Sequence, residues 1–217
     1  MRIAPSILSA DFTRLGSEIE RVEKAGAHQL HVDVMDGHYV PNLTFGPMIV
    51  EAIRRSTKLP LDVHLMIENA DRWIDAYVDA GADMIAFHPE SIHHPHLVLT
   101  SIQKRGKKAG LALNPSTSLA TVEELLPLSD YAIVMSVNPG WGGQEFIEGS
   151  FDRVERLRRL VDERGYRLSI EIDGGINAAR VPLAAAAGVD VVIAGSAIFR
   201  AEDPEAVVRQ MLSAVQV

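Results

Sequence analysis

The chain has 217 residues, enough for one domain or for two small ones. Cysteine is absent, so the sequence excludes disulfides, thiolate nucleophiles, zinc–thiolate sites and iron–sulfur clusters. A formal net charge of −8 argues against a nucleic-acid or membrane partner. No apolar run reaches the ~18–20 residues of a spanning helix, and Asp11 interrupts the N-terminal segment before a signal-like stretch develops. We therefore expect a cytoplasmic protein.

Short apolar segments recur along the chain, and amphipathic segments with helical spacing separate them. The eight predicted strands are Ile3–Leu8, Gln29–Met35, Leu61–Met66, Met84–His88, Lys108–Leu113, Tyr131–Val137, Leu168–Asp173 and Val189–Gly195. The last predicted helix is Pro204–Val215, with proline early in its first turn. Strands that alternate with helices favour a parallel sheet with right-handed crossovers. Eight such units in this length predict a (β/α)8 TIM barrel, formed as a single domain over residues 1–217.

An Ala-Gly pair recurs near the predicted strands. The pairs are Ala25-Gly26, Ala80-Gly81, Ala109-Gly110 and Ala187-Gly188. Their separations of 55, 29 and 78 residues are about two, one and three units of ~27 residues, which supports an internal repeat. Each glycine is predicted to end a helix in the left-handed conformation before the next strand. An open doubly wound sheet would need a glycine-rich turn after the first strand, where the sequence has Ser9-Ala10-Asp11 instead.

Polar residues stand in three predicted strands where a parallel sheet is usually apolar. His31 and Asp33 share one face of the second strand, Asp62 and His64 share one face of the third, and Asp173 ends the seventh. The carboxyl ends of barrel strands face the mouth, where active sites are built. Burying these groups without a cation would cost several kcal/mol per charge. Nitrogen and oxygen ligands suit several metals, and we expect one divalent cation per subunit, Zn²⁺ before Fe²⁺, Mn²⁺ or Co²⁺.

The remaining histidines carry weaker signals. His93-His94-Pro95-His96 follows the fourth predicted strand and is expected to be a solvated run. His88 ends that strand directly before Pro89, and no role is assigned to it.

Glycine-bearing loops follow the sixth, seventh and eighth predicted strands. Their backbone N–H groups can approach an anion closely, and barrels of this kind commonly bind phosphate after strands 7 and 8. No Lys or Arg lies in these loops, so amides and helix dipoles would hold the anion. The candidate phosphate-binding residues are Gly140, Trp141, Gly142 and Gly143, then Gly174 and Gly175, then Gly195 and Ser196.

A metal beside two carboxylates, with a phosphate-binding loop across the mouth, suits proton transfer next to the carbonyl of a sugar phosphate. Inversion of a carbon needs a base on one face and an acid on the other. Asp33 and Asp173 lie on different sides of the predicted ring and are well placed for opposite faces. Either carboxylate can act as the base, depending on the direction of the reaction.

Seven motifs cover nearly the whole chain in order. They are Pro5-Ser6-Ile7-Leu8-Ser9-Ala10-Asp11-Phe12, His31-Val32-Asp33-Val34-Met35-Asp36-Gly37-His38, Val40-Pro41-Asn42, Asp62-Val63-His64-Leu65-Met66, Val137-Asn138-Pro139-Gly140, Asp173-Gly174-Gly175 and Ala194-Gly195-Ser196. In this combination the chain resembles the ribulose-phosphate 3-epimerase family. The resemblance implies an isomerase that interconverts D-ribulose 5-phosphate and D-xylulose 5-phosphate in the pentose phosphate pathway, and a homo-oligomer.

The resemblance also implies roles for individual residues. It makes His31, Asp33, His64 and Asp173 the metal ligands, with Asp33 as proton acceptor and Asp173 as proton donor. Ser6 and His64 would touch the substrate, a small sugar phosphate. The residues that would hold the sugar and its phosphate are Gly140, Trp141, Gly142, Gly143, Asp173, Gly174, Gly175, Gly195 and Ser196. Met35, Met66 and Met135 would cap the enediolate, although inward methionines are also common core residues. Trp141 stands where the family more often has phenylalanine.

Three alternatives are weighed at the level of sequence, and the second is disfavoured because the cation that its chemistry requires is missing. A sister 3-epimerase acts on D-allulose 6-phosphate, which is one carbon longer and would use the same metal site. Related phosphate-barrel decarboxylases resemble this fold but use Asp-x-Lys-x-x-Asp on the equivalent strand, where this chain has Met35 in the lysine position. A non-catalytic metal- or phosphate-binding barrel would explain the histidines but not the carboxylates on two strands.

Overall fold

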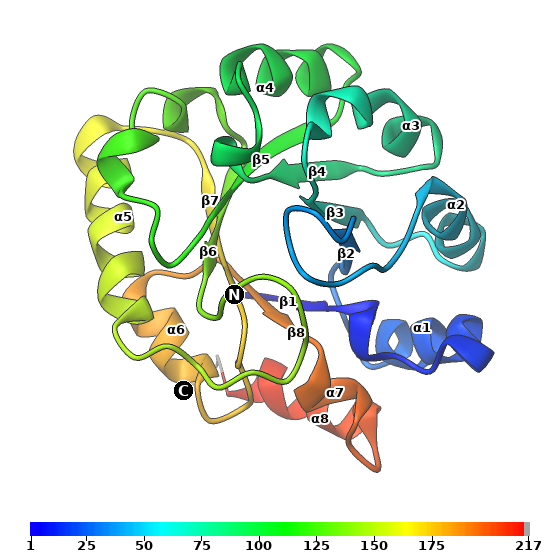
Figure 1. The fold of residues 1–217 in the computed structure, drawn as a ribbon. Helices are drawn as coiled ribbons and strands as arrows, with labels where there is room; N and C mark the ends of the chain where they lie inside the picture. The colour runs from blue at the N-terminus through cyan, green and yellow to red at the C-terminus, as the bar shows by residue number, and fades with distance from the viewer. Residues whose placement is uncertain (215–217) are drawn as a thin grey trace.

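Eight parallel strands form a barrel, and the helices lie around its outside (Figure 1). The computed structural model describes residues 1–214. The strands are β1 (Arg2–Pro5), β2 (Leu30–Met35), β3 (Leu61–Met66), β4 (Met84–Phe87), β5 (Lys108–Leu113), β6 (Tyr131–Met135), β7 (Ser169–Asp173) and β8 (Val191–Ala194). They pair in the order β1-β8-β7-β6-β5-β4-β3-β2. The predicted single-domain (β/α)8 barrel is therefore confirmed, while its predicted end at residue 217 lies outside the described residues.

Helices connect successive strands and cover the outer face of the barrel (Figure 1). The α-helices are α1 (Leu15–Lys24), α2 (Pro47–Ser56), α3 (Ile74–Asp79), α4 (Pro95–Lys104), α5 (Ser150–Arg164), α6 (Val181–Ala187), α7 (Ser196–Phe199) and α8 (Pro204–Ser213). The 3-10 helices are η1 (Ile7–Ser9), η2 (Phe12–Arg14), η3 (Ala70–Arg72), η4 (Pro89–Ser91), η5 (Leu119–Thr121) and η6 (Leu126–Leu128). The predicted last helix begins at Pro204 as expected but ends at Ser213, and Val215 lies outside the described residues.

The barrel closes between β1 and β2 through one isolated parallel bridge, Ser6 to His31. The prediction that the first strand continues to Leu8 is wrong, because β1 ends at Pro5 and the chain turns into η1. The backbone N–H of Ala10 donates to the carbonyl of Ile7 and stabilises that turn. The turn leaves Ser6 at the carboxyl end of β1, next to β2.

Alternation along each strand divides the apolar side chains into an outer and an inner layer. In β6, Ala132 and Val134 point outward and belong to the large cluster between the strands and the helices. Tyr131, Ile133 and Met135 point inward and belong to a smaller cluster inside the barrel. The inner row therefore runs from Tyr131 at the amino end of the strand to Met135 at the mouth.

Three of the four Ala-Gly pairs behave as predicted. Gly26, Gly81 and Gly188 follow helices and have φ values of 101°, 109° and 97°, which favour glycine. The prediction for Gly110 is wrong, because this residue lies inside β5 and Gly106, with φ of 71°, ends the preceding helix. The ring of Tyr131 lies against Gly110 and occupies the space that a Cβ would need.

We expect Gly110→Ala to lower the free energy of unfolding by about 1–3 kcal/mol, because the new methyl group would displace the Tyr131 ring inside a packed barrel. Urea unfolding of the purified protein measures this change. Gly46→Ala is the matched control, since a Cβ there meets no atom within 4 Å. Equal stability of the native protein and Gly110→Ala would contradict the packing described here.

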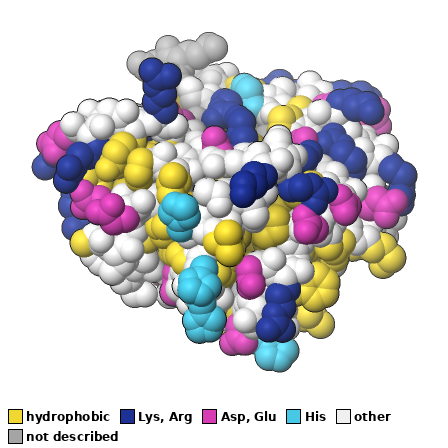
Figure 2. All heavy atoms as spheres, turned by 90° about the horizontal axis from the view of Figure 1, so that it is seen from above, with side chains coloured by type: hydrophobic (Ala, Val, Ile, Leu, Met, Phe, Trp, Pro, Cys, Tyr) yellow, Lys and Arg dark blue, Asp and Glu magenta, His cyan; other side chains and the backbone are white. Residues whose placement is uncertain are grey.

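Acidic and basic side chains are interspersed over the face that Figure 2 shows. Within residues 1–214, no helix combines the length and the apolar character needed to cross a bilayer.

Candidate active site

Four side chains converge at the carboxyl ends of the strands. His31 and Asp33 come from β2, His64 from β3 and Asp173 from β7. One ligand atom from each of the four can be chosen so that all lie within 4.8 Å of one another. The four residues that the sequence analysis names as metal ligands are thus brought together in one cluster.

The pairing of β2 with β3 explains why the histidines meet. Asp33 lies beside His64 in the register, and His31 lies beside Asp62. Since side chains alternate along a strand, all four point into the barrel. His31 Nε2 lies 3.4 Å from Asp33 Oδ1, and His64 Nδ1 lies 3.6 Å from the same oxygen. One carboxylate oxygen therefore faces two imidazole nitrogens.

The residues of this cluster fit a divalent cation. His31 Nε2 and His64 Nδ1 are buried and have no hydrogen-bond partner among the described residues. Buried nitrogens without partners are costly, and a shared cation beside Asp33 would satisfy both. The charges of Asp33 and Asp62 outweigh burial and raise the pKa of His31, so the cluster favours a positive charge at this point. Imidazole and carboxylate donors suit Zn²⁺, Fe²⁺, Mn²⁺ and Co²⁺.

The two carboxylates of the cluster have different environments. Burial would raise the pKa of Asp33, but the nearby positive charge of His31 outweighs it and holds that pKa well below its usual range. Ser6 Oγ also donates to Asp33 Oδ2 at 2.5 Å. Burial and the nearby charge of Asp33 raise the pKa of Asp173 to about 7. The pair is thus separated into a carboxylate that stays ionised and one that holds its proton more readily.

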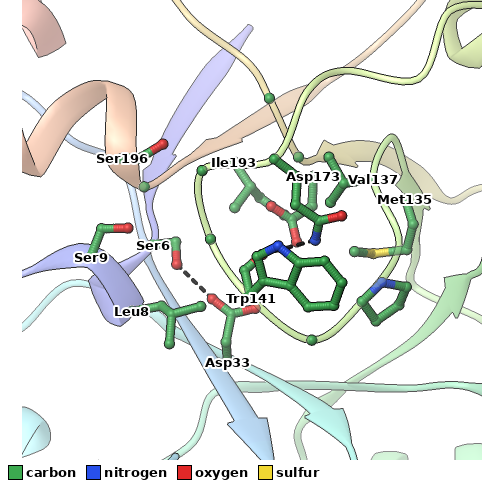
Figure 3. A pocket seen from close by; sticks show the side chains of 18 of the residues that line it. Ser6, Leu8, Ser9, Asp33, Met135, Val137, Trp141, Asp173, Ile193 and Ser196 are labelled. Atoms are coloured by element: carbon green, nitrogen blue, oxygen red, sulfur yellow. Dashed lines mark hydrogen bonds between the residues drawn. The ribbon is translucent and has the colours of Figure 1, made fainter. Parts of the chain in front are cut away.

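A cavity opens above the cluster, and most of the predicted substrate-binding residues line it (Figure 3). His64, which was predicted to touch the substrate, and the predicted metal ligand His31 do not line it, because both are fully buried. The predicted residues that line the cavity are Ser6, Asp33, Met35, Met66, Met135, Gly140, Trp141, Gly142, Gly143, Asp173, Gly174, Gly175, Gly195 and Ser196. Asp33 and Asp173 enter the cavity from different strands, with Ser6 bonded to Asp33 (Figure 3).

The glycine loops of the cavity are places where a side chain would not fit. Gly174 has φ of 120°, and a Cβ there would lie 2.5 Å from a methyl carbon of Val137. At Gly195 a Cβ would meet Ser9 Oγ at 3.1 Å. Gly174 and Gly195 therefore leave their backbone close to the cavity, which is the arrangement an anion-binding loop needs.

Arg200 is a basic residue near these loops that the sequence analysis missed. It follows α7, outside the glycine-bearing segments, yet its guanidinium lies beside Gly143, where an added Cβ would be 3.3 Å from Nη1. No signal in the sequence places it there, because the contact joins loops that are 57 residues apart. A cation is therefore available next to the predicted phosphate loop.

The loop after β6 is tied to its surroundings by side-chain amides. Asn42 Nδ2 donates to the carbonyl of Gly140 at 2.8 Å. Gln144 Nε2 donates to the carbonyls of Asn138 and Trp141. Trp141 is 52% exposed and lines the cavity. The backbone of this loop is thus fixed while the indole stays accessible to solvent.

A second row of buried polar side chains supports the cluster from outside. The sequence analysis counts Asp62 among the inward polar groups but gives no role to Tyr131 or His88. Asp62 accepts a hydrogen bond from Tyr131 Oη at 2.6 Å, and its other oxygen lies 2.7 Å from His31 Nδ1. His88 Nε2 lies 2.9 Å from His64 Nε2. The alternation of side chains along β3 could have predicted the position of Asp62 behind the site. The contacts of Tyr131 and His88 depend on the register between strands, which the sequence does not show.

Known proteins resemble the chain at the levels of fold and sequence. The fold is similar to that of a mutant tryptophan synthase α-subunit from Pyrococcus furiosus, with a TM-score of 0.74 and 14% identity over 100% of this chain and 98% of that one. It is also similar to 3-hexulose-6-phosphate synthase, with a TM-score of 0.72 and 17% identity over 99% and 100% of the two chains. At these identities the likeness shows the barrel fold alone.

Sequence relatives are far more similar. Ribulose-phosphate 3-epimerase of Bacillus subtilis is 49% identical over 204 residues, 94% of each chain. Ribulose-phosphate 3-epimerase of Aquifex aeolicus is 48% identical over 219 aligned positions, 99% of each chain, and that of Escherichia coli K12 is 46% identical over 97% of this chain and 94% of its own. The model of the ribulose-phosphate 3 epimerase family matches residues 2–199. The chain therefore belongs to the ribulose-phosphate 3-epimerase family and is an isomerase.

Proposed function

We propose that the protein epimerises C3 of D-ribulose 5-phosphate to give D-xylulose 5-phosphate, with one divalent cation bound by His31, Asp33, His64 and Asp173. Family membership supports the substrate. The observation that carries the proposal is the placement of two carboxylates, Asp33 and Asp173, in one cavity below loops that fit a phosphate. Metal binding alone would account for these carboxylates as ligands, but not for their position in a cavity that is also lined by the glycine loops.

Asp33 and Asp173 exchange protons with C3 from opposite faces of the substrate. The Asp33 carboxylate accepts the proton from C3, and the electron pair of that bond forms the C2–C3 double bond of an enediolate. Asp173 then donates a proton to the other face of C3 while the carbonyl at C2 re-forms. The reverse reaction exchanges the two roles. Ser6, which donates to Asp33 in the structure, holds the carboxylate in place.

Negative charge develops on the substrate oxygens during this step. A divalent cation at the cluster, when bound, supplies a Lewis acid that stabilises this charge. The chain itself supplies the bare nitrogens of His31 and His64 together with the Asp33 oxygen between them.

The loops hold the substrate by its phosphate and exclude water from its reacting end. Backbone amides near Gly174 and Gly195 bind the phosphate, and the Arg200 guanidinium beside Gly143 adds a positive charge. Met35, Met66 and Met135 give the cavity an apolar wall next to the carboxylates. We propose that this wall covers the enediolate. We also propose, from family membership, that the protein forms a homo-oligomer.

Proton NMR in D2O with ribulose 5-phosphate tests the proposal. We expect xylulose 5-phosphate to form with deuterium at C3, because the carboxylates exchange their protons with solvent between turnovers. D-allulose 6-phosphate, run in parallel, reports on the alternative substrate. Turnover of allulose 6-phosphate alone would overturn the substrate assignment. No exchange at C3 of either sugar, with metal supplied, would overturn the mechanism with two carboxylates.

A further inference from the structure

His88 lies behind the proposed metal site, directly after β4. Its side chain is fully buried, and the Tyr39 ring covers it with a centroid distance of 4.8 Å. Its backbone is fixed at the start of η4, where its carbonyl accepts hydrogen bonds from the amide and the hydroxyl of Ser91. His88 is therefore a rigid, buried imidazole whose only side-chain hydrogen bond among the described residues is the one with His64.

The contact between His64 and His88 allows only two proton arrangements. Their Nε2 atoms are 2.9 Å apart, so one of the two nitrogens carries a proton and the other accepts it. If His88 donates, Nε2 of His64 is the acceptor. A neutral His64 then carries its proton on its other ring nitrogen, Nδ1, and cannot bind a metal through that atom. If His64 donates from Nε2, its Nδ1 is left with a free lone pair that faces Asp33 at 3.6 Å. Only the second arrangement makes His64 a metal ligand.

The surroundings of His88 favour that second arrangement. When His88 accepts at Nε2, its own proton is on Nδ1, an atom that has no hydrogen-bond partner among the described residues. The carboxylate oxygen Oε1 of Glu90 lies 3.9 Å from this Nδ1. A proton on Nδ1 is attracted by the carboxylate, whereas a bare lone pair there would be repelled. Glu90 is held by Tyr39 Oη at 3.1 Å and by Thr117 Oγ1 at 3.2 Å, so its charge stays near His88.

We propose that His88 is a positioning residue for the epimerase. It accepts the Nε2 proton of His64 and thereby fixes His64 in the tautomer whose Nδ1 faces the metal site. The inference rests on the proposed function, because it assigns a role toward the cation used there. His31 has a different outer partner, the carboxylate of Asp62 at 2.7 Å, so the two histidine ligands are held by chemically distinct groups.

Two substitutions of His88 separate hydrogen bonding from packing. His88→Phe keeps an aromatic ring but leaves the His64 N–H buried without an acceptor, and His88→Gln supplies an amide oxygen that can accept it. We expect the dissociation constant for Zn²⁺, measured on the full chain by competition with a chelator, to rise ~10–100-fold in His88→Phe and to stay within about threefold in His88→Gln. Met84→Leu, a change at a buried inward residue of β4, the strand that precedes His88, is the control and should bind Zn²⁺ as the native protein does.

Native-like Zn²⁺ affinity in a folded His88→Phe protein would overturn the proposal. A second measurement needs no variant: long-range ¹⁵N–¹H spectra of the zinc-loaded native protein report which nitrogen of each histidine carries the proton. We expect the proton on Nε2 of His64 and on Nδ1 of His88, and a proton on Nε2 of His88 would refute the assignment.

These readouts are independent of turnover. A native protein that shows the expected tautomers but leaves C3 of ribulose 5-phosphate unexchanged would overturn the proposed function and would still support the positioning role of His88.

Discussion

Asp33→Asn and Asp173→Asn are each expected to lower kcat for epimerisation by roughly 10³–10⁴-fold, because each removes a group that is proposed to exchange a proton with C3. Both variants keep the shape of the side chain, and the phosphate loops are untouched. We therefore expect both variants still to bind ribulose 5-phosphate, although weakly. Initial rates with ribulose 5-phosphate, at a concentration of Zn²⁺ that saturates each variant, measure the loss.

Isotope exchange distinguishes the two carboxylates. If Asp33 accepts the proton of ribulose 5-phosphate, Asp173→Asn should still exchange the C3 proton of this sugar with D2O without forming xylulose 5-phosphate. Asp33→Asn should show the converse, with exchange into xylulose 5-phosphate only. This pattern follows because each face of C3 meets its own carboxylate.

Asp83→Asn serves as the control for these variants. Asp83 precedes β4 at the opposite end of the barrel, where its carboxylate accepts the amide of Leu61 and binds Arg54, so its loss should affect stability rather than turnover. Retained epimerisation in folded Asp33→Asn and Asp173→Asn would show that these two carboxylates do not carry the proton transfer.

Removal of the metal is expected to abolish epimerisation and to lower the melting temperature. Without a cation, the bare nitrogens of His31 and His64 would lose the common partner that we propose for them beside Asp33. A metal present at about 100 times its dissociation constant stabilises the fold by ~2.7 kcal/mol. In a chain of this size that corresponds to a loss of roughly 5–11 °C on chelation. Elemental analysis, activity and thermal unfolding before and after dialysis against a chelator measure these effects.

Readdition of single metals identifies which cation restores activity, with Zn²⁺ tested first and Fe²⁺, Mn²⁺ and Co²⁺ after it. The exposed histidine His94 provides the control, because His94→Gln should change neither the metal content nor the recovery. Full activity in protein that elemental analysis shows to be free of metal would remove the cation from the mechanism.

The sequence was sufficient to predict the parts of the site that depend on local periodicity. Alternation along β2 and β3 places His31, Asp33 and His64 on inward faces, and the carboxyl ends of parallel strands bring them to the same edge as Asp173. The barrel itself follows from eight repeated units. These predictions need only the spacing of residues within each segment.

Contacts between distant segments could not be predicted in this way. Arg200 reaches Gly143, and His88 reaches His64, through loop paths and strand register that no single segment encodes. Gly110 is a position where local spacing gave a wrong prediction. The repeat suggested the end of a helix, while the ring of Tyr131 requires a glycine inside a strand. Packing across the barrel decides these positions.

The junction at which the barrel closes, between β1 and β2, lies next to the site. Elsewhere in the ring neighbouring strands form a continuous ladder, but the backbone pairing beside β1 and β2 is limited to the bridge from Ser6 to His31 and the hydrogen bonds of Ile3 with His28. Ser6 is also the residue whose hydroxyl holds Asp33. The carboxylate that we propose transfers the proton is thus held where the barrel closes, and separation of the strands there breaks the fewest hydrogen bonds. A ligand that contacts both β1 and β2 would therefore stabilise the barrel at this junction.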